Sequence, residues 1–458
     1  MTDAEEDLRE EETRALDPGR VGAILEAVEA GDVAHLDELT EPLHPADIAD
    51  LLEQIGPAER RALVALWPAG IDGDVLSELD ESIREEVIEA LPHQMLADAV
   101  RELDSDDVVD LIQDLEEPQQ DRILGALDPS DRMAVEQAML WPEYSAGRLM
   151  QRETVVAPED WTAGQAIDFL RSEDWLPDQF YHVILVDPRM RPLAYVTLGR
   201  LLAARRDTPL RDITEDSFRT IPATMAEGEV AYLFNQYHLI SAPVVDEGER
   251  LVGVITIDDA MAVLEEETEE DILRLGGVGD ESLNDGIVET TRQRFPWLFV
   301  NLLTANLASL VVAQFEHVIS VLVALAALMP IVASMGGNTG TQSLTIAVRA
   351  IATRDLTHAN AWRVIRREVA VAVLNGMAFA VIMGLVAWLG YGIPRLGMVI
   401  AAAMLVNLAV AGLAGVLVPL GLNRLRLDPA LASGTFVTTI TDVVGFFSFL
   451  GLATLVLL

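Results

Sequence analysis

The sequence predicts a multidomain membrane protein in which an all-α helical-repeat N domain, an α/β tandem repeat, a connecting helix and a five-helix transmembrane domain follow one another. Three observations predict this fold class. Amphipathic segments at helical spacing fill the first third of the chain, a strand-turn-strand motif occurs twice in the middle, and apolar stretches of about 20 residues dominate the end. We expect the four parts at residues 1–140, 141–263, 264–295 and 296–458.

The charge of the chain is concentrated before the apolar region. Residues 296–458 contain five acidic residues and eight arginines, so 69 of the 74 acids and 23 of the 31 basic residues lie in residues 1–295. A surface this negative repels nucleic acid and attracts cations, so we expect no nucleic acid partner. Solubility or salt adaptation explains part of the same charge equally well, since the chain has no lysine.

Residue types limit the kind of metal site that the chain can build. It has no cysteine, and its seven histidines are scattered without ligand spacing. Thiolate sites are excluded, so any metal must be held by oxygen, which suits Mg²⁺, Ca²⁺ or Mn²⁺. The first residues show no basic stretch followed by an apolar one, so we expect no signal peptide.

Short amphipathic segments separated by Pro, Gly or Asp occupy residues 21–139. Their apolar residues recur at i, i+3, i+4 and i+7, which predicts helices. The segments are residues 48–55, 60–66, 85–91, 108–115 and 121–127. Those that begin near Leu51 and Leu111 resemble each other, which suggests a stacked helical array that serves as a scaffold or interaction surface.

A clearer repeat lies in the middle of the chain. Residues 185–197 align with residues 244–256 without a gap, and each copy is predicted as strand, turn and strand after a helix. The predicted helices are residues 162–171 and 226–236. The pattern resembles a tandem pair of CBS domains over residues 146–263.

The CBS resemblance implies a nucleotide site. In such modules a Thr and an Asp three residues apart contact the phosphate and ribose of adenine nucleotides, and Thr256 and Asp259 match them. The first copy has Arg200 where the Asp is expected, so at most one full site for ATP is implied. A purely structural pair without a ligand is the alternative.

An acidic run follows the second repeat. Six of the seven residues at 265–271 are acidic, in a segment that continues to Arg292 and Arg294 before the apolar region. Acids near a helix start provide capping and solubility. Their number here exceeds that need, and the repulsion between them would be relieved by a bound cation.

Five apolar stretches are long enough to cross a bilayer. They are residues 297–314, 318–335, 369–389, 398–422 and 436–458. The second is the most ambiguous, because small and polar residues extend it to Ile351. Five arginines lie between the second and third stretches and two between the fourth and fifth, while the opposite loops hold none and one. Because positive residues stay inside, we expect a plasma membrane protein with a cytoplasmic N-terminus and an outside C-terminus.

One carboxylate, Asp442, lies within the last predicted span. A charge at the bilayer centre costs at least ~2.5 kcal/mol, so this residue is a candidate functional site. Threonines surround it, and Thr438 and Thr439 are candidate lining residues. An Asp that is bonded to those hydroxyls merely to hold helices together is the alternative.

A second polar place lies at residues 329–343. Pro330 and several small residues predict a broken backbone with free carbonyls, and Asn338, Thr341 and Gln342 add side-chain oxygens. Such backbone at membrane depth is tolerated where it is buried in protein or lines a water-filled cavity. Together with the last span it describes a cation path lined by oxygen, although small residues also serve close helix packing.

The membrane region carries a stronger resemblance. Pro330 with Gly-Gly-Asn-Thr-Gly-Thr-Gln, Arg367-Glu-Val with Leu374-Asn-Gly, residues 423–433, and Asp442 before Gly445 are similar to the MgtE family of magnesium channels. The order of domains agrees over nearly the whole chain. The resemblance implies a Mg²⁺-selective channel that forms a homodimer within membrane lipid, with the pore on the two-fold axis and closure by cytosolic Mg²⁺.

The resemblance also implies roles for individual acids. Asp442 matches the selectivity carboxylate, so a dimer presents two. The cytosolic Mg²⁺ sites and the acid at the inner membrane face match Asp259, Glu267, Glu270, Asp271 and Asp428. Mg²⁺ dehydrates reluctantly, so a pair of carboxylates that bind the hydrated ion through its waters is a plausible filter.

Three alternatives remain beside a magnesium channel. Oxygen ligands alone do not exclude a transporter for another divalent cation such as Co²⁺ or Mn²⁺. A membrane aspartyl enzyme needs two carboxylates that share a proton, and only Asp442 lies inside a predicted span, so we expect no enzyme. A CBS-regulated anion transporter conflicts with the absence of basic residues along the spans.

Overall fold

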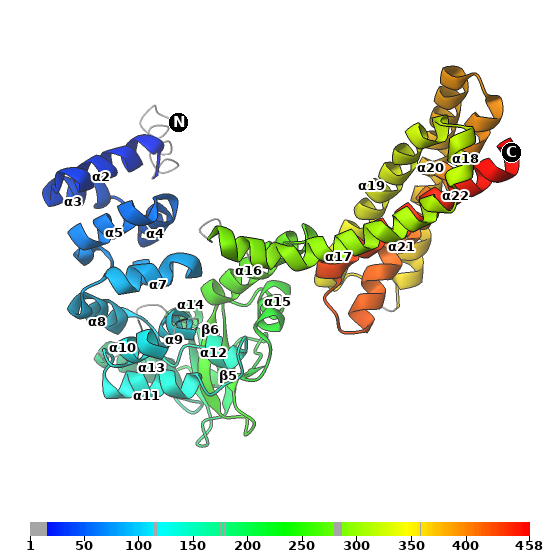
Figure 1. Ribbon diagram of the computed structural model, residues 1–458. Helices are drawn as coiled ribbons and strands as arrows, with labels where there is room; N and C mark the ends of the chain where they lie inside the picture. The colour runs from blue at the N-terminus through cyan, green and yellow to red at the C-terminus, as the bar shows by residue number, and fades with distance from the viewer. Residues whose placement is uncertain are drawn as a thin grey trace, which may run out of the picture. The chain divides into compact units, whose positions relative to one another are not determined.

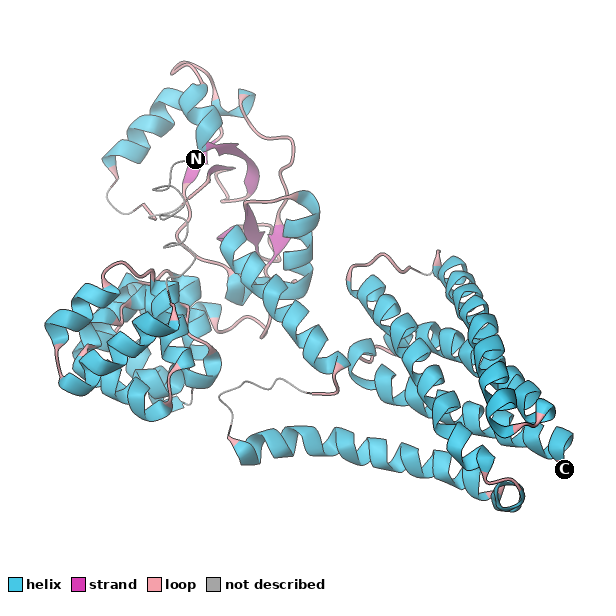
Figure 2. Ribbon diagram, turned by 90° about the horizontal axis from the view of Figure 1, so that it is seen from above, coloured by secondary structure: helices cyan, strands magenta, loops and turns pink. Residues whose placement is uncertain are grey.

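The computed structural model describes residues 16–458 except residues 114, 116, 174–175, 178–179, 279–285 and 358. The chain forms two compact units, Met1–Glu267 and Thr268–Leu458 (Figure 1). The strands, magenta in Figure 2, are confined to one part of the first unit, and the second unit is helical where it is described. The fold class predicted from the sequence is confirmed.

The N-terminal part of the first unit consists of short helices joined by tight connections. They are α2 (Pro18–Ala30), α3 (Val33–Thr40), α4 (Pro45–Gln54), α5 (Pro57–Leu66), α6 (Gly73–Ser77), α7 (Glu81–Ala90), α8 (His93–Glu102), α9 (Ser105–Gln113), α10 (Glu117–Leu124) and α11 (Pro129–Ala138), with a 3₁₀ turn at Pro68–Gly70. Apolar residues at helical spacing, among them Leu51, Leu63 and Val87, form one fully buried core. Aspartates cap several helices, as Asp17 does by accepting a hydrogen bond from the Arg20 amide at 2.8 Å.

The second part of this unit contains two copies of one motif. The first copy comprises α12 (Ala146–Leu149), β1 (Val156–Pro158), α13 (Ala163–Ser172), β2 (His182–Val186), β3 (Pro192–Thr197) and α14 (Leu198–Ala203), followed by a 3₁₀ turn at Leu210–Asp212. The second comprises β4 (Ile221–Pro222), α15 (Glu227–Tyr237), β5 (Ser241–Val245), β6 (Leu251–Thr256) and α16 (Ile257–Leu275).

The two sheets have the same topology and register. In each, a first strand pairs parallel with a second, which pairs antiparallel with a third. His182 is paired with Thr197 in one sheet, and Ser241 is paired with Thr256 in the other. The internal repeat read from the sequence is therefore a repeat of structure.

The connecting helix differs from its predicted limits. α16 is continuous from Ile257, directly after β6, to Leu275, so no element begins at residue 264. It ends at Gly276 and Gly277, where Gly277 adopts a φ of 73°, a left-handed conformation that stops a helix. Residues 279–285 of the predicted connecting helix lie outside the described residues.

The second unit contains α17 (Ile287–Ala313), α18 (Glu316–Val321), α19 (Ala324–Ala352), α20 (Ala361–Tyr391), α21 (Pro394–Arg424) and α22 (Pro429–Leu457). Among the described residues, four helices are long and apolar enough to cross a membrane: α17, α20, α21 and α22. α19 is as long, but polar residues dilute its hydropathy. α21 is central, since 61% of its most apolar window is buried against 6% for α17.

Two predictions about the second span are wrong. The span at residues 318–335 is interrupted at Leu322 and Val323, which separate α18 from α19. The predicted break at residues 329–343 is absent, because α19 is a continuous α-helix through Pro330 and its glycines. The buried faces of Gly336 and Gly340 lie against α21 and α22, where a Cβ atom on either glycine would collide with a neighbouring side chain. The small residues therefore serve close helix packing, the alternative stated for this stretch.

Candidate functional site

Asp442 lies on the fourth turn of α22, a helix that begins with a strong cap. Asp428 is the N-cap residue and accepts a hydrogen bond from the Ala430 amide at 2.7 Å, and Pro429 occupies the first helical position. From Pro429 to the end of the chain, Asp442 is the only ionisable side chain. It is partly exposed within the single chain.

The threonines around Asp442 do not bond to it. Thr438 donates its hydroxyl hydrogen to the Gly434 carbonyl at 2.9 Å, and Thr439 donates to the Thr435 carbonyl at 2.7 Å. Thr441, which is fully buried, donates to the Thr438 carbonyl at 2.9 Å. Among the described residues no group donates a hydrogen bond to Asp442 or pairs with its charge. The alternative reading, an Asp that hydroxyls hold in place, is therefore not supported.

The predicted polar residues of α19 share one face. Asn338, Thr341 and Gln342 are exposed, whereas Gly336 and Gly340 on the other side of the helix are buried. Nothing in the described part of the chain bonds their side chains to Asp442. An exposed amide or hydroxyl on a membrane helix normally faces water or another protein chain, since lipid offers no hydrogen bonds.

A second carboxylate lies within a candidate membrane helix, whereas the sequence placed only Asp442 inside a predicted span. Glu368 is on α20, outside the predicted span at residues 369–389 but inside the helix that the structure contains. Its side chain is 5% exposed, and Ser343 of α19 donates to its Oε2 at 3.2 Å.

In the first unit, the Asp259 carboxylate is bonded by two groups of Thr256, its hydroxyl and its backbone amide. Thr256 donates its hydroxyl hydrogen to Asp259 Oδ2 at 2.7 Å, and the Thr256 amide lies 3.4 Å from the same oxygen. The Thr-x-x-Asp pair, predicted as a nucleotide motif, thus forms a cap at the start of α16. The matching Thr197 caps α14 by accepting from the Arg200 amide at 3.3 Å.

Acids of the helical N-terminal part face Asp259. Burial, then the charge of Asp259, raise the pKa of Asp107 to about 7 and that of Asp106 well above its usual value. Burial also raises the pKa of Asp259 to about 7, with the charges of Asp258 and Asp110 adding to the effect. No basic side chain compensates these acids in the described residues. Sequence reasoning missed Asp106 and Asp107, because acids at the first turn of α9 look like ordinary helix-start residues.

These carboxylates do not form a ready metal site. Within the described part of the chain, no group of three or more His, Cys, Asp or Glu side chains is arranged to hold a metal ion. The acids repel one another at a distance without converging on one point.

The acids of α16 are separated as well. Glu267 lies against Gly228 of α15, while Glu270 pairs with Arg274 one turn further along. Arg274 also donates to Asp428 Oδ2 at 2.8 Å, so its guanidinium joins Glu270 to the N-cap of α22. Asp271 is half-buried on the same helix. The predicted cytosolic ligands Asp259, Glu267, Glu270 and Asp271 are not brought together within one chain.

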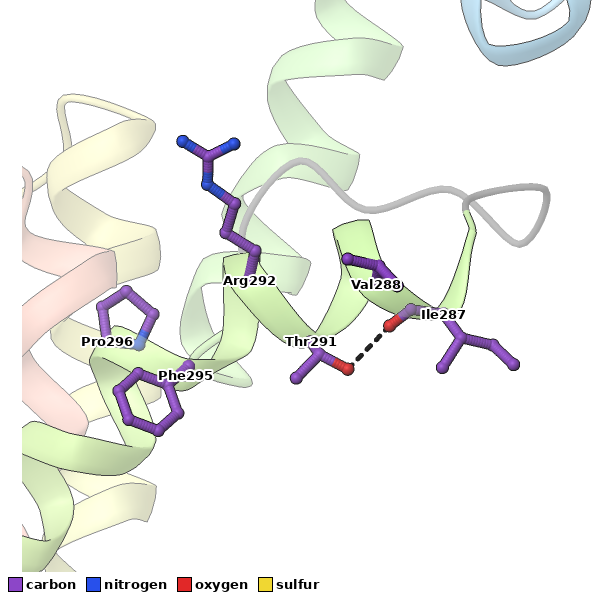
Figure 3. Close-up of a pocket in the computed structure, with 6 residues that line it drawn as sticks. All are labelled: Ile287, Val288, Thr291, Arg292, Phe295 and Pro296. Carbon is purple, nitrogen blue, oxygen red and sulfur yellow. Dashed lines mark hydrogen bonds between the residues drawn. The ribbon is translucent and has the colours of Figure 1, made fainter.

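One hollow in the second unit has the wrong chemistry for a cation. It measures about 470 Å³ and lies along the first turns of α17, between Ile287 and Pro296. Figure 3 shows Ile287, Val288 and Phe295 with Arg292 around it, and the Thr291 hydroxyl bonded to the Ile287 carbonyl at 2.6 Å. Mostly apolar walls with one guanidinium and no carboxylate do not suit Mg²⁺.

Comparisons with known proteins match most of the chain. Residues 329–452 match the MgtE divalent cation transporter family, residues 43–144 match the MgtE intracellular N domain, and residues 210–266 match the CBS domain. The magnesium transporter MgtE of Thermus thermophilus is 34% identical over 442 residues, which cover 95% of this chain and 98% of the relative.

The chain belongs to the MgtE family.

Two further comparisons give similar proteins. The magnesium transporter MgtE of Bacillus subtilis is 26% identical over 93% of this chain and 94% of its own. A solved structure of the cytosolic domain of the Mg²⁺ channel MgtE in complex with ATP is 31% identical, covers 53% of this chain and 99% of that chain, and superposes with a TM-score of 0.49. As a member of the MgtE family the chain is a multi-pass membrane transporter and not an enzyme, as predicted from the sequence.

Proposed function

We propose that the protein forms a Mg²⁺-selective pore in the plasma membrane and that Asp442 is its selectivity carboxylate. One observation carries this proposal. Asp442 is a carboxylate without counter-charge or hydrogen-bond donor among the described residues, on an apolar helix without a basic side chain. Placing such a group in a membrane costs free energy, and a transported cation offsets that cost.

The lining of the pore follows from polar side chains that are exposed or, for Thr439, partly exposed. We assign Asn338, Thr341 and Gln342 of α19 and Thr438 and Thr439 of α22 to the path. Because Thr438 and Thr439 donate to their own helix, their oxygens remain acceptors for the water shell of Mg²⁺. Mg²⁺ keeps several of its waters, so acceptors at this distance from the ion suit it better than direct ligands.

A single Asp442 is too little for a filter, so the proposal includes a homodimer with one carboxylate from each chain. The exposure of Asn338, Thr341 and Gln342 in the single chain supports a partner or a water-filled path at that face. The distribution of arginines between the spans supports a cytoplasmic N-terminus and an outside C-terminus. Lipid surrounds the remaining helix faces.

The gate is proposed to respond to cytosolic Mg²⁺. Asp106, Asp107 and Asp259 repel one another without a basic residue nearby, so a divalent cation would hold the N-terminal helices and the CBS pair together. Asp259 lies on the first turn of α16, which ends at Leu275, so the helix can carry that change to the membrane unit. Glu267, Glu270, Asp271 and Asp428 remain proposed sensor ligands, with contributions from both chains. The other domain limits predicted from the sequence remain proposals.

ATP remains a proposed ligand of the CBS pair, away from this cluster. Asp259 is engaged by Thr256 and surrounded by acids, an environment that repels phosphate, so the Thr256 and Asp259 pair favours a cation over a nucleotide. Calorimetry of the full chain with ATP decides the matter, and the absence of heat would leave the pair a structural module.

Uptake into liposomes tests the pore. We expect Asp442→Ala to abolish Mg²⁺ influx, while Asp355→Ala, an exposed acid in a loop, leaves it unchanged. Unchanged influx in Asp442→Ala would overturn the proposal. Parallel uptake of Co²⁺ and Mn²⁺ distinguishes a magnesium pore from a pore for another divalent cation.

A further inference from the structure

Asn407 of α21 lies at the point where three helices of the membrane unit meet. Its side chain is fully buried, and its Nδ2 donates a hydrogen bond to the Val332 carbonyl of α19 at 2.8 Å. This polar bond joins α21 to α19 in a region whose buried residues, among them Leu328, Met404 and Leu408, are apolar.

Two glycines make room for this side chain. A Cβ atom on Gly336 of α19 would lie closer than 3.0 Å to Asn407 Nδ2, and one on Gly445 of α22 would lie 2.7 Å from it. Real Cβ atoms do not approach so closely, so any other residue at either position would displace the amide or the helix. Asn407 thus fills the space that two missing side chains leave on two different helices.

The two glycines lie next to the proposed lining of the pore. Gly336 precedes Asn338 by two residues, and Gly445 follows Asp442 by three residues, which is less than one helical turn. α21 itself contributes none of the proposed lining residues. Asn407 of α21 therefore contacts both α19 and α22, the two helices that carry the proposed lining residues.

The chemistry of the amide indicates more than space filling. No donor among the described residues reaches Asn407 Oδ1, which is buried, so this oxygen loses its hydrogen bonds to water without replacement. An apolar side chain of the same size would fill the space without that cost. An apolar contact lets one helix slide along another, whereas the hydrogen bond to the Val332 carbonyl fixes the axial position of α19 relative to α21.

We propose that Asn407 is a positioning residue that sets the spacing and relative height of α19 and α22, and thereby the distance between Asn338 and Asp442. The inference rests on the proposed function, in which these two helices form the wall of the Mg²⁺ path. A filter that recognises the water shell of an ion depends on acceptor positions, so a shift of either wall changes which ion it accepts.

A set of full-length variants tests the packing. Gly336→Ala should clash with Asn407 and lower both the melting temperature and the Mg²⁺ influx, the influx by about tenfold or more. The double variant Gly336→Ala with Asn407→Ala should recover both, because the amide that clashes is gone. If the double variant is no better than Gly336→Ala alone, the contact between these residues does not matter and the proposal is wrong.

A near-isosteric variant tests the positioning role. Asn407→Leu keeps the branched shape and the number of side-chain heavy atoms but removes the hydrogen bond, so we expect a folded protein whose KM for Mg²⁺ and ratio of Mg²⁺ to Co²⁺ influx both change by roughly threefold or more. Asn306→Ala is the matched control, since Asn306 is exposed and bonds only to Leu302 of its own helix. An unchanged KM and ratio in a folded Asn407→Leu protein would overturn the proposal.

Failure of the proposed function gives a different result. A wild-type protein without Mg²⁺ influx would remove the function, whereas the melting temperatures of the Gly336 and Asn407 variants still report on the contact.

Discussion

His182 shows how one buried side chain joins the two CBS repeats. It lies at the first position of β2, and its Nδ1 contacts the hydroxyl of Ser241 at the equivalent position of β5. The ring is 9% exposed and lies 4.2 Å, centroid to centroid, from Tyr195. Burial lowers the pKa of His182 to about 4, so the ring is neutral at physiological pH.

This lowered pKa predicts a loss of stability in acid. The unfolded chain takes up the proton near pH 6.5, whereas the folded chain resists it until about pH 4. The free energy of unfolding of the CBS pair should therefore fall as pH drops from about 6.5 to about 4, by up to roughly 3 kcal/mol, and His182 should contribute no pH dependence above this window.

Thermal unfolding of the full chain between pH 4 and 7.5 measures this effect. His182→Gln should flatten the profile, whereas His238→Asn should not, because His238 is an exposed helix cap in the left-handed conformation that Asn also adopts. Identical profiles for the wild type and His182→Gln would contradict the assignment.

The sequence predicted that acidic residues form a cation-attracting surface, but it did not predict which acids are buried beside Asp259. The excess of acids indicated a cation-binding surface, yet the residues that face Asp259 are Asp106 and Asp107, more than 140 positions earlier in the chain. Nothing in their local sequence separates them from the aspartates that cap helices. Only burial against a distant acid changes their chemistry.

At the scale of elements, the end of α16 is tied to the start of α22. Arg274 joins Glu270 to Asp428, which also caps α22, and Leu275 packs against Leu344, Val348 and Ala430. The sequence predicted a bound cation for Glu270 and Asp428, and in this chain a guanidinium lies between them. Arg274 therefore contributes to docking of the connecting helix.

Removal of this guanidinium should loosen the helix end. We expect Arg274→Gln to increase hydrogen exchange at residues 268–275 by about fivefold, corresponding to a partly exposed ion pair of about 1 kcal/mol. Millimolar Mg²⁺ should reverse the change, because it can bridge the freed carboxylates.

Arg292→Gln serves as the control, since Arg292 is exposed and has no ion pair in the described residues. Equal exchange in Arg274→Gln and the wild type would show that the apolar contacts of Leu275 alone hold the helix end.

At the scale of the whole molecule, the proposed pore requires two chains. α19 buries its glycine face within one chain and leaves Asn338, Thr341 and Gln342 exposed. A two-fold axis beside this face would bring two α19 helices together and place two Asp442 carboxylates at one ion path.

Cross-linking measures this arrangement directly, because the chain has no cysteine. A single Thr341→Cys substitution should form a disulfide between two chains in the membrane under mild oxidation. Val381→Cys on α20, which is 63% exposed, should not. A transporting protein that remains monomeric throughout would contradict the dimeric pore.

The sequence by itself determined the elements and the class of the protein. Helical spacing, the tandem repeat and the apolar stretches depend on residues close together in the chain, and they identified the all-α part, the CBS pair and the membrane helices. Asp442 was also recognisable, because a lone carboxylate in an apolar run is conspicuous without any knowledge of its neighbours.

Only the tertiary structure decided what lies between the elements. Residues 329–343 could have interrupted a helix or allowed a helix to pack closely against its neighbours. The outcome depended on Asn407 and Val437, which lie on other helices and face the glycines. The pairing of Arg274 with Asp428 joins residues 154 positions apart. Such contacts depend on which faces of two helices pack together, and this is decided by the residues of both helices and not by the sequence of one alone.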